Sequence, residues 1–67
     1  MNANKLLGAM AEKRISQREL ARQLGISKNT INSKINGKVH FNTEEASKIC
    51  DILEIKDPQK KSEIFLP

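Results

Sequence analysis

Two helix start signals follow one another closely between residues 16 and 36, and this feature constrains the fold more than any other. Ser16 and Glu19 form a capping box, in which Ser16 accepts the Glu19 amide hydrogen and the Glu19 side chain reaches back. Ser27 is a second N-cap residue, and Gly25 between them can adopt the left-handed conformation that ends a helix. Two short helices joined by a tight turn are the pattern of a helix-turn-helix. The sequence therefore predicts a helix-turn-helix over about residues 16–36.

The rest of the chain is also expected to be helical. It is poor in alternating β-branched residues and has two Phe but no Trp or Tyr, which argues against strands. Further helices are predicted over about Ala3–Lys13, from after Asn42 to about Leu53, and over Pro58–Phe65. Leu6, Leu7 and Met10 are expected to face inward, and Asn42 forms a second capping box with Glu45. Since 67 residues suffice for one core, the expected fold is all-α, a compact five-helix domain over residues 1–67.

The positive charge of the chain is concentrated in residues 13–38. The whole sequence has a formal net charge of +4, whereas this segment holds seven basic residues and one acid, a net charge of +6. The remainder holds five basic and seven acidic residues, a net charge of −2. A solvated amphipathic surface would explain any single lysine or arginine here. It does not explain two capped helices, a glycine turn and an acid-free outward face together, which favour a face that binds a polyanion.

The second helix of the pair has an apolar side and a polar side. At about 100° per residue, Ile31 and Ile35 face inward and leave an outward face without an acidic residue. In the major groove of DNA, Asn can bond adenine and Lys can bond guanine. The outward face from Lys28 to Ser33 is expected to read the base sequence. The expected phosphate-contacting residues are Gln17, Ser27, Thr30, Asn36 and Lys38.

Residues 16–38, SQRELARQLGISKNTINSKINGK, resemble the helix-turn-helix of the Cro/C1 phage repressor family, and the likeness extends loosely over nearly the whole chain. The resemblance implies that family's domain of five short helices. It also implies a dimeric regulator of transcription, of phage or prophage type, that binds an inverted-repeat operator. In that binding mode Gln17 lies on phosphate, and the expected base-reading residues are Lys28, Asn29, Asn32 and Ser33. Met10 and Ile35 stand where many relatives carry a buried Arg–Glu pair, and apolar residues of fitting volume can replace such a pair. With its 67 residues the chain is expected to lack an effector domain, as a Cro-type regulator does.

The predicted function is a sequence-specific, double-stranded DNA-binding repressor that works as a homodimer, at least on DNA. One alternative is a protein-binding helix-turn-helix module, such as an antirepressor or antitoxin, that acts through another regulator. Its contact surface would be the acidic C-terminal half or the apolar end at Ile64–Leu66. These apolar residues could close the core, form a dimer seam, or do both with different side chains.

No catalytic, metal or cofactor site is expected. His40 is the one histidine, and it has no Cys, Asp or second His at ligand spacing. Cys50 is the one cysteine and is expected to be a small core residue. A single cysteine forms no disulfide within the chain, so a cytoplasmic protein is expected. No apolar run is long enough to span a bilayer, and neither a membrane nor a small-molecule substrate is an expected partner.

Overall fold

Five α-helices and the turns between them make up residues 1–66, which the computed structural model describes. The helices are α1 (Ala3–Glu12), α2 (Gln17–Leu24), α3 (Lys28–Ile35), α4 (Thr43–Ile52) and α5 (Pro58–Phe65). The predicted all-α, five-helix fold is confirmed, and α1 and α4 each end one residue earlier than predicted. None of the helices in residues 1–66 has the length and apolar character that crossing a membrane requires.

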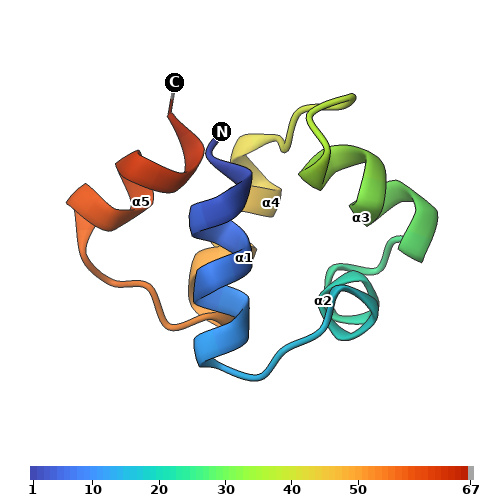
Figure 1. The fold of residues 1–67 in the computed structure, drawn as a ribbon, viewed down its shortest axis with the longest axis horizontal. Helices are drawn as coiled ribbons and strands as arrows, with labels where there is room; N and C mark the ends of the chain where they lie inside the picture. The colour runs from blue at the N-terminus through green and yellow to red at the C-terminus, as the bar shows by residue number, and fades with distance from the viewer. Residues whose placement is uncertain (67) are drawn as a thin grey trace.

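Figure 1 shows how the helices are arranged. α1 runs through the centre of the view with α4 behind it, α5 lies on one side, and α2 and α3 lie on the other. α2 contacts both α3 and α4, and α1 contacts α5. The two ends of the described chain lie close together, because the Asn2 amide donates to the Ile64 carbonyl oxygen at 2.7 Å. α3 thus forms an edge of the molecule and leaves one of its sides open.

Each helix starts at a side chain that accepts a hydrogen bond from a backbone amide of the first turn. The N-cap residues are Asn2, Ser16, Ser27, Asn42 and Asp57. At α4 the predicted capping box is complete. Asn42 Oδ1 accepts from the Glu45 amide at 2.7 Å, and Glu45 Oε1 accepts from the Asn42 amide at 3.0 Å. The helix starts are therefore fixed by local hydrogen bonds.

The capping box predicted at α2 forms in one direction only. Ser16 Oγ accepts from the Glu19 amide at 3.1 Å, as expected. The Glu19 carboxylate, however, accepts from the Arg22 guanidinium through both oxygens and from Gln23 Nε2 at 2.9 Å. A charge-assisted, two-point contact with arginine is stronger than a bond to one backbone amide. The predicted return contact from Glu19 is therefore wrong.

α1 to α4 all end in the same kind of left-handed turn. The residues with positive φ in these turns are Arg14 (56°), Gly25 (73°), Gly37 (82°) and Glu54 (56°). In each turn, the amide of the residue that follows the left-handed one donates to the carbonyl oxygen five residues before it. These bonds are 2.8 to 3.0 Å long and form the Schellman pattern. Glycine adopts this conformation without strain, whereas Arg14 and Glu54 adopt it at a cost. The two turns that flank α3 are thus the two built on glycine.

The residue that follows the left-handed position sets the turn after α3 apart. Ile15, Ile26 and Ile55 follow it after α1, α2 and α4, and all three pack in or against the core. The corresponding residue after α3 is Lys38, which is exposed. An apolar residue at this position commonly anchors such a turn to its helix. The turn after α3 presents a cation at the surface instead.

All five helices contribute to one apolar core. The fully buried side chains are Leu6, Leu20, Ile31, Ile49, Leu53 and Ile64. Met10 and Ile35, at the positions of the ion pair in the resembled family, are each 3% exposed and belong to the same cluster. Leu7 is 37% exposed, so the prediction that it faces inward is wrong. Leu6, Ala9 and Met10 form the buried stripe of α1, and Leu7 is turned about 100° away from Leu6.

Candidate nucleic-acid interface

α3 has a buried side and an exposed side, as its residue spacing predicts. Ile31 and Ile35 are buried and fix the inner side of the helix. The predicted base-reading residues are the exposed Lys28, Asn29 and Asn32 and the half-buried Ser33. α3 contains no acidic residue, and it lies at the edge of the molecule (Figure 1). The exposed side therefore offers amide and ammonium groups with no carboxylate among them.

Three of the predicted site residues are joined by side-chain hydrogen bonds. Asn36 Nδ2 donates to Asn32 Oδ1 at 2.9 Å, and Asn32 Nδ2 donates to Gln17 Oε1 at 3.3 Å. We call this chain of carboxamides the amide ladder. It links a predicted base-reading residue of α3 to two predicted phosphate-contacting residues, one of which lies at the start of α2. The bond between Asn32 and Gln17 crosses between two helices, so the sequence could not reveal it. The bond between Asn36 and Asn32 joins residues four apart, a spacing that places two side chains on one helix face and could have indicated the contact.

The first turn of α3 is closed by two hydroxyl groups. Ser27 Oγ accepts from the Thr30 amide at 3.1 Å, and the Ser27 and Thr30 hydroxyl oxygens lie 2.8 Å apart. Both residues are exposed. Both were predicted to contact phosphate, and the structure places them side by side at the N-terminus of α3. Amide groups at such a helix end, together with hydroxyl donors, suit an anion.

The seven basic residues of the positive segment divide into paired and unpaired groups. The ion pairs in this segment are Lys13–Glu54, Arg22–Glu19 and Lys34–Glu45. Arg14, Arg18, Lys28 and Lys38 make no ion pair within residues 1–66. The outward positive charge is therefore smaller than the sequence count indicates. The predicted site does not include Arg14 and Arg18, although neither has an acidic residue three or four positions away in the sequence, a signal that each is unpaired.

An ion pair that was not predicted lies at the end of α3. Lys34 Nζ is 2.6 Å from Glu45 Oε1, and the two side chains are only 11% and 17% exposed. Lys34 Nζ also lies 5.7 Å from the centroid of the Phe41 ring and 3.4 Å from the His40 carbonyl oxygen. The hydrogen bond from Lys34 and, next, the bond from the Asn42 amide hold the pKa of Glu45 below its ordinary value. Lys34 thus braces α3 against α4.

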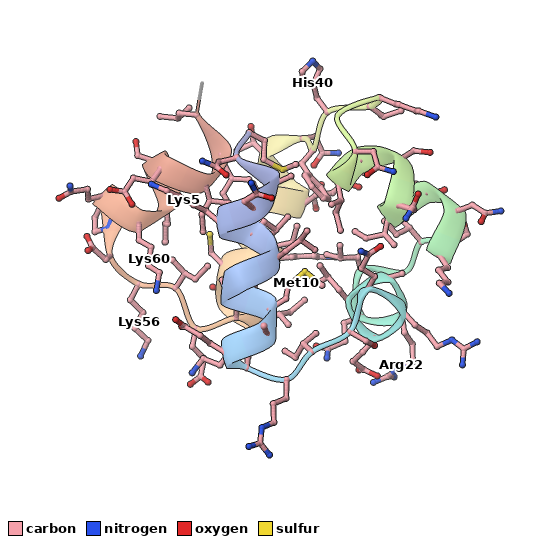
Figure 2. All side chains as sticks on the ribbon, viewed as in Figure 1. Lys5, Met10, Arg22, His40, Lys56 and Lys60 are labelled. Carbon is pink, nitrogen blue, oxygen red and sulfur yellow. The ribbon has the colours of Figure 1, made fainter. Side chains whose placement is uncertain are left out.

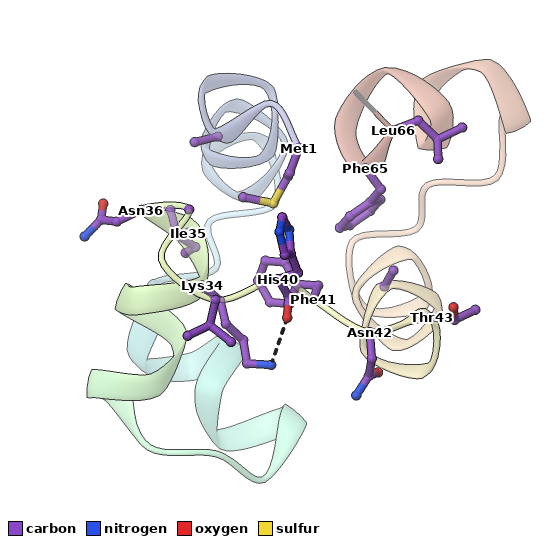
Figure 3. A pocket seen from close by; sticks show the side chains of 14 residues that line it. Met1, Lys34, Ile35, Asn36, His40, Phe41, Asn42, Thr43, Phe65 and Leu66 are labelled. Atoms are coloured by element: carbon purple, nitrogen blue, oxygen red, sulfur yellow. Dashed lines mark hydrogen bonds between the residues drawn. The ribbon is translucent and has the colours of Figure 1, made fainter.

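A groove of about 590 Å³ lies between the end of α3, the start of α4 and the end of α5. Figure 3 shows the side chains that line it. Met1, Val39 and Leu66 border the groove and are 37%, 49% and 60% exposed, which is high for large apolar residues. Phe41 and Phe65 form an edge-to-face pair within the lining, with ring centroids 6.2 Å apart. This groove lies beside the predicted DNA-reading helix, and exposed apolar side chains border it.

The apolar C-terminal residues divide between core and surface. Ile64 is 1% exposed and belongs to the core, and Phe65 packs against the core from a half-buried position. Leu66 lies at the surface. Core closure at Ile64 is therefore confirmed, and Leu66 is available for a contact.

The remaining candidate groups take no part in this surface. Cys50 is buried, as predicted, and burial raises the pKa of its thiol. His40 is exposed in the loop between α3 and α4. Within residues 1–66 there is no group of three His, Cys, Asp or Glu side chains that could hold a metal ion.

The sequence matches a family model, the Cro/C1-type HTH DNA-binding domain, over residues 5–59. The match covers most of the chain, from within α1 to the first turn of α5. It includes every residue predicted to read bases or contact phosphate. No curated protein and no solved structure gives a match.

Proposed function

Because the chain belongs to the Cro/C1-type helix-turn-helix DNA-binding family, we propose that it is a sequence-specific regulator of transcription that represses by binding double-stranded DNA. The observation that carries this proposal is the exposed side of α3, which is acid-free while Ile31 and Ile35 hold the opposite side in the core. The protein acts by binding rather than by catalysis.

In this proposal α3 enters the major groove and α2 crosses the DNA backbone. Asn29 and Asn32 are suited to adenine and Lys28 to guanine, and Ser33 lies at the edge of the same face. The contacts that fix the position of the protein on phosphate come from Gln17, Ser27, Thr30, Asn36 and Lys38. Sequence is thus read by the middle of α3, and register is set by the residues around it.

We further propose that two copies bind an inverted repeat whose half-sites lie about one helical turn apart. The groove bordered by Met1, Val39 and Leu66 supports this, because a second copy would cover apolar side chains that are exposed in one chain. The groove also adjoins the end of α3, so pairing there would set the spacing of the two reading helices. Such a dimer would repress by occupying a site that overlaps a promoter.

The groove also favours a second candidate function, a protein-binding module that captures another regulator. The apolar residues of its border would then contact that partner instead of a second copy. The repressor requires a specific DNA sequence, whereas the protein-binding module does not.

The test is selection from a random duplex library at near-physiological salt, followed by sequencing of the retained DNA. We expect an inverted repeat to be enriched by the wild type and lost with Lys28→Ala. Lys56→Ala is the charge-matched control, because Lys56 lies on the side of the molecule away from α3 (Figure 2). A single enriched half-site would contradict the dimer. Retention that depends on salt but enriches no sequence would contradict the repressor and support the protein-binding module.

A further inference from the structure

The amide ladder has a direction, and that direction determines which atoms remain for DNA. Asn36 donates to Asn32, and Asn32 donates to Gln17. A carboxamide nitrogen carries two hydrogens and a carboxamide oxygen has two lone pairs. Asn32 therefore keeps one N–H donor and one acceptor position, which are the two that a bidentate contact with adenine requires.

The two ends of the ladder, Gln17 and Asn36, keep hydrogen-bond donors that phosphate can accept. Gln17 uses its oxygen to accept from Asn32 and keeps both hydrogens of Nε2 for other partners. Asn36 uses one hydrogen of Nδ2 and keeps the second. Phosphate oxygens are acceptors only, so each end presents the group that phosphate needs. The reverse direction would present the Gln17 oxygen to phosphate.

We propose that Gln17 and Asn36 are positioning residues for base recognition, which hold the Asn32 carboxamide in the orientation that reads adenine. This inference rests on the proposed function, and it assigns to two residues expected to contact phosphate a second role in sequence discrimination. Asn32 and Asn36 are exposed and Gln17 is half-buried. Bonds among such groups compete with water in the free protein and strengthen where DNA excludes water. The ladder thus couples correct seating on phosphate to correct reading of the base.

The experiment measures discrimination rather than affinity. Selection with the wild type and with Asn32→Ala identifies the base pair whose preference depends on Asn32. The dissociation constants of each variant are then measured for the selected operator and for the same operator changed at that base pair. Wild type is expected to discriminate on the order of tenfold or more. Asn36→Ala is expected to reduce this ratio by about three- to tenfold, the value of one hydrogen bond.

Lys38→Ala is the matched control, because Lys38 is also a predicted phosphate contact and lies outside the ladder. It is expected to weaken both operators equally and leave the ratio unchanged. A ratio unchanged in Asn36→Ala, with both operators weakened alike, would overturn the positioning role while the proposed function stands. Failure of the wild type to enrich any sequence would overturn both. Thermal unfolding of each variant shows that these surface changes leave the protein folded.

Discussion

Lys34 Nζ of α3 lies 2.6 Å from Glu45 Oε1 of α4, in an ion pair largely withdrawn from solvent. The same glutamate oxygen accepts from the Asn42 amide and so completes the capping box of α4. One carboxylate therefore closes the first turn of α4 and also holds the last turn of α3. Together with the buried Ile31 and Ile35, this contact fixes the helix that we propose reads DNA.

Replacing Lys34 by Met is expected to lower the free energy of unfolding by about 1–2 kcal/mol, because Glu45 would keep a half-buried charge without its cation. Urea unfolding followed by circular dichroism measures the change. Lys60→Met is the control, since Lys60 lies 4.0 Å from Glu12 and both side chains are largely exposed. Exposed pairs of this kind contribute at most about 1 kcal/mol. An equal decrease in the free energy of unfolding of the two variants would show that the Lys34–Glu45 pair stabilises the protein no more than an exposed pair does.

The pH dependence of stability should report the same carboxylate. The pKa of Glu45 is lowered in the folded protein, so this group stabilises the fold above its ordinary pKa and the gain is lost as pH falls through the folded value. Urea midpoints measured from about pH 6 to about pH 3 should therefore fall less steeply in Glu45→Gln than in the wild type. The pKa of Glu19 is also lowered, chiefly by its hydrogen bond with Arg22, but this pair is exposed. Glu19→Gln should have the smaller effect, and the opposite order would contradict the assignment.

The left-handed turns predict that introducing glycine at one site stabilises the protein and that replacing glycine at another site destabilises it. Arg14→Gly should raise the free energy of unfolding by about 0.5–1 kcal/mol, because it relieves a left-handed arginine, while Arg14→Ala should not. Gly25→Ala should lower it by about 1 kcal/mol. A Cβ atom at Gly25 would have no atom within 4 Å, so that loss would come from the backbone alone. Thermal and urea unfolding of the three variants check the signs.

Substitutions on the proposed DNA-binding surface should separate base reading from phosphate contact. Asn29→Ala should cost roughly 1–3 kcal/mol of binding free energy and relax the preference at one base pair. Lys38→Ala should weaken binding to all sequences alike and reduce the slope of log affinity against log salt by about one. Fluorescence anisotropy at several salt concentrations measures both. A uniform loss with Asn29→Ala would remove this residue from the reading face.

The groove predicts where two copies meet. Val39→Ser should weaken self-association on the order of tenfold, because a valine buried in an interface stabilises it through its apolar area. Leu7→Ser is the matched control, since Leu7 is similarly exposed and does not line the groove. Sedimentation velocity with and without operator DNA provides the measurement. Dimers weakened equally by both substitutions, or by Leu7→Ser alone, would place the interface elsewhere.

The features that could be predicted from the sequence are those fixed by neighbours along the chain. The caps at Ser16, Ser27 and Asn42 bond amides three residues away, and the spacing of Ile31 and Ile35 orients α3. These signals are local, so they predict the number of helices, the helix bounds to within one residue and the exposed side of α3.

The features that escaped prediction depend on competition or on contacts between helices. Glu19 had two possible partners, and Arg22 offers the stronger one. Lys34 contributes to the positive charge that the sequence predicts for the outward surface, but it follows Ile31 by three positions and so flanks the buried side of α3, where it pairs with Glu45. The amide ladder joins Gln17 to Asn32 across two helices, and only their packing brings the two amides together.

α3 is held in place through few of its residues: Ile31 and Ile35 inside, and Lys34 at its end. Lys28 and Asn29 are exposed and do not contribute to these packing and ion-pair contacts. Natural variation at these two positions is therefore expected to change DNA preference without loss of folding, so that duplicated copies of such a chain can diverge into regulators of different sites.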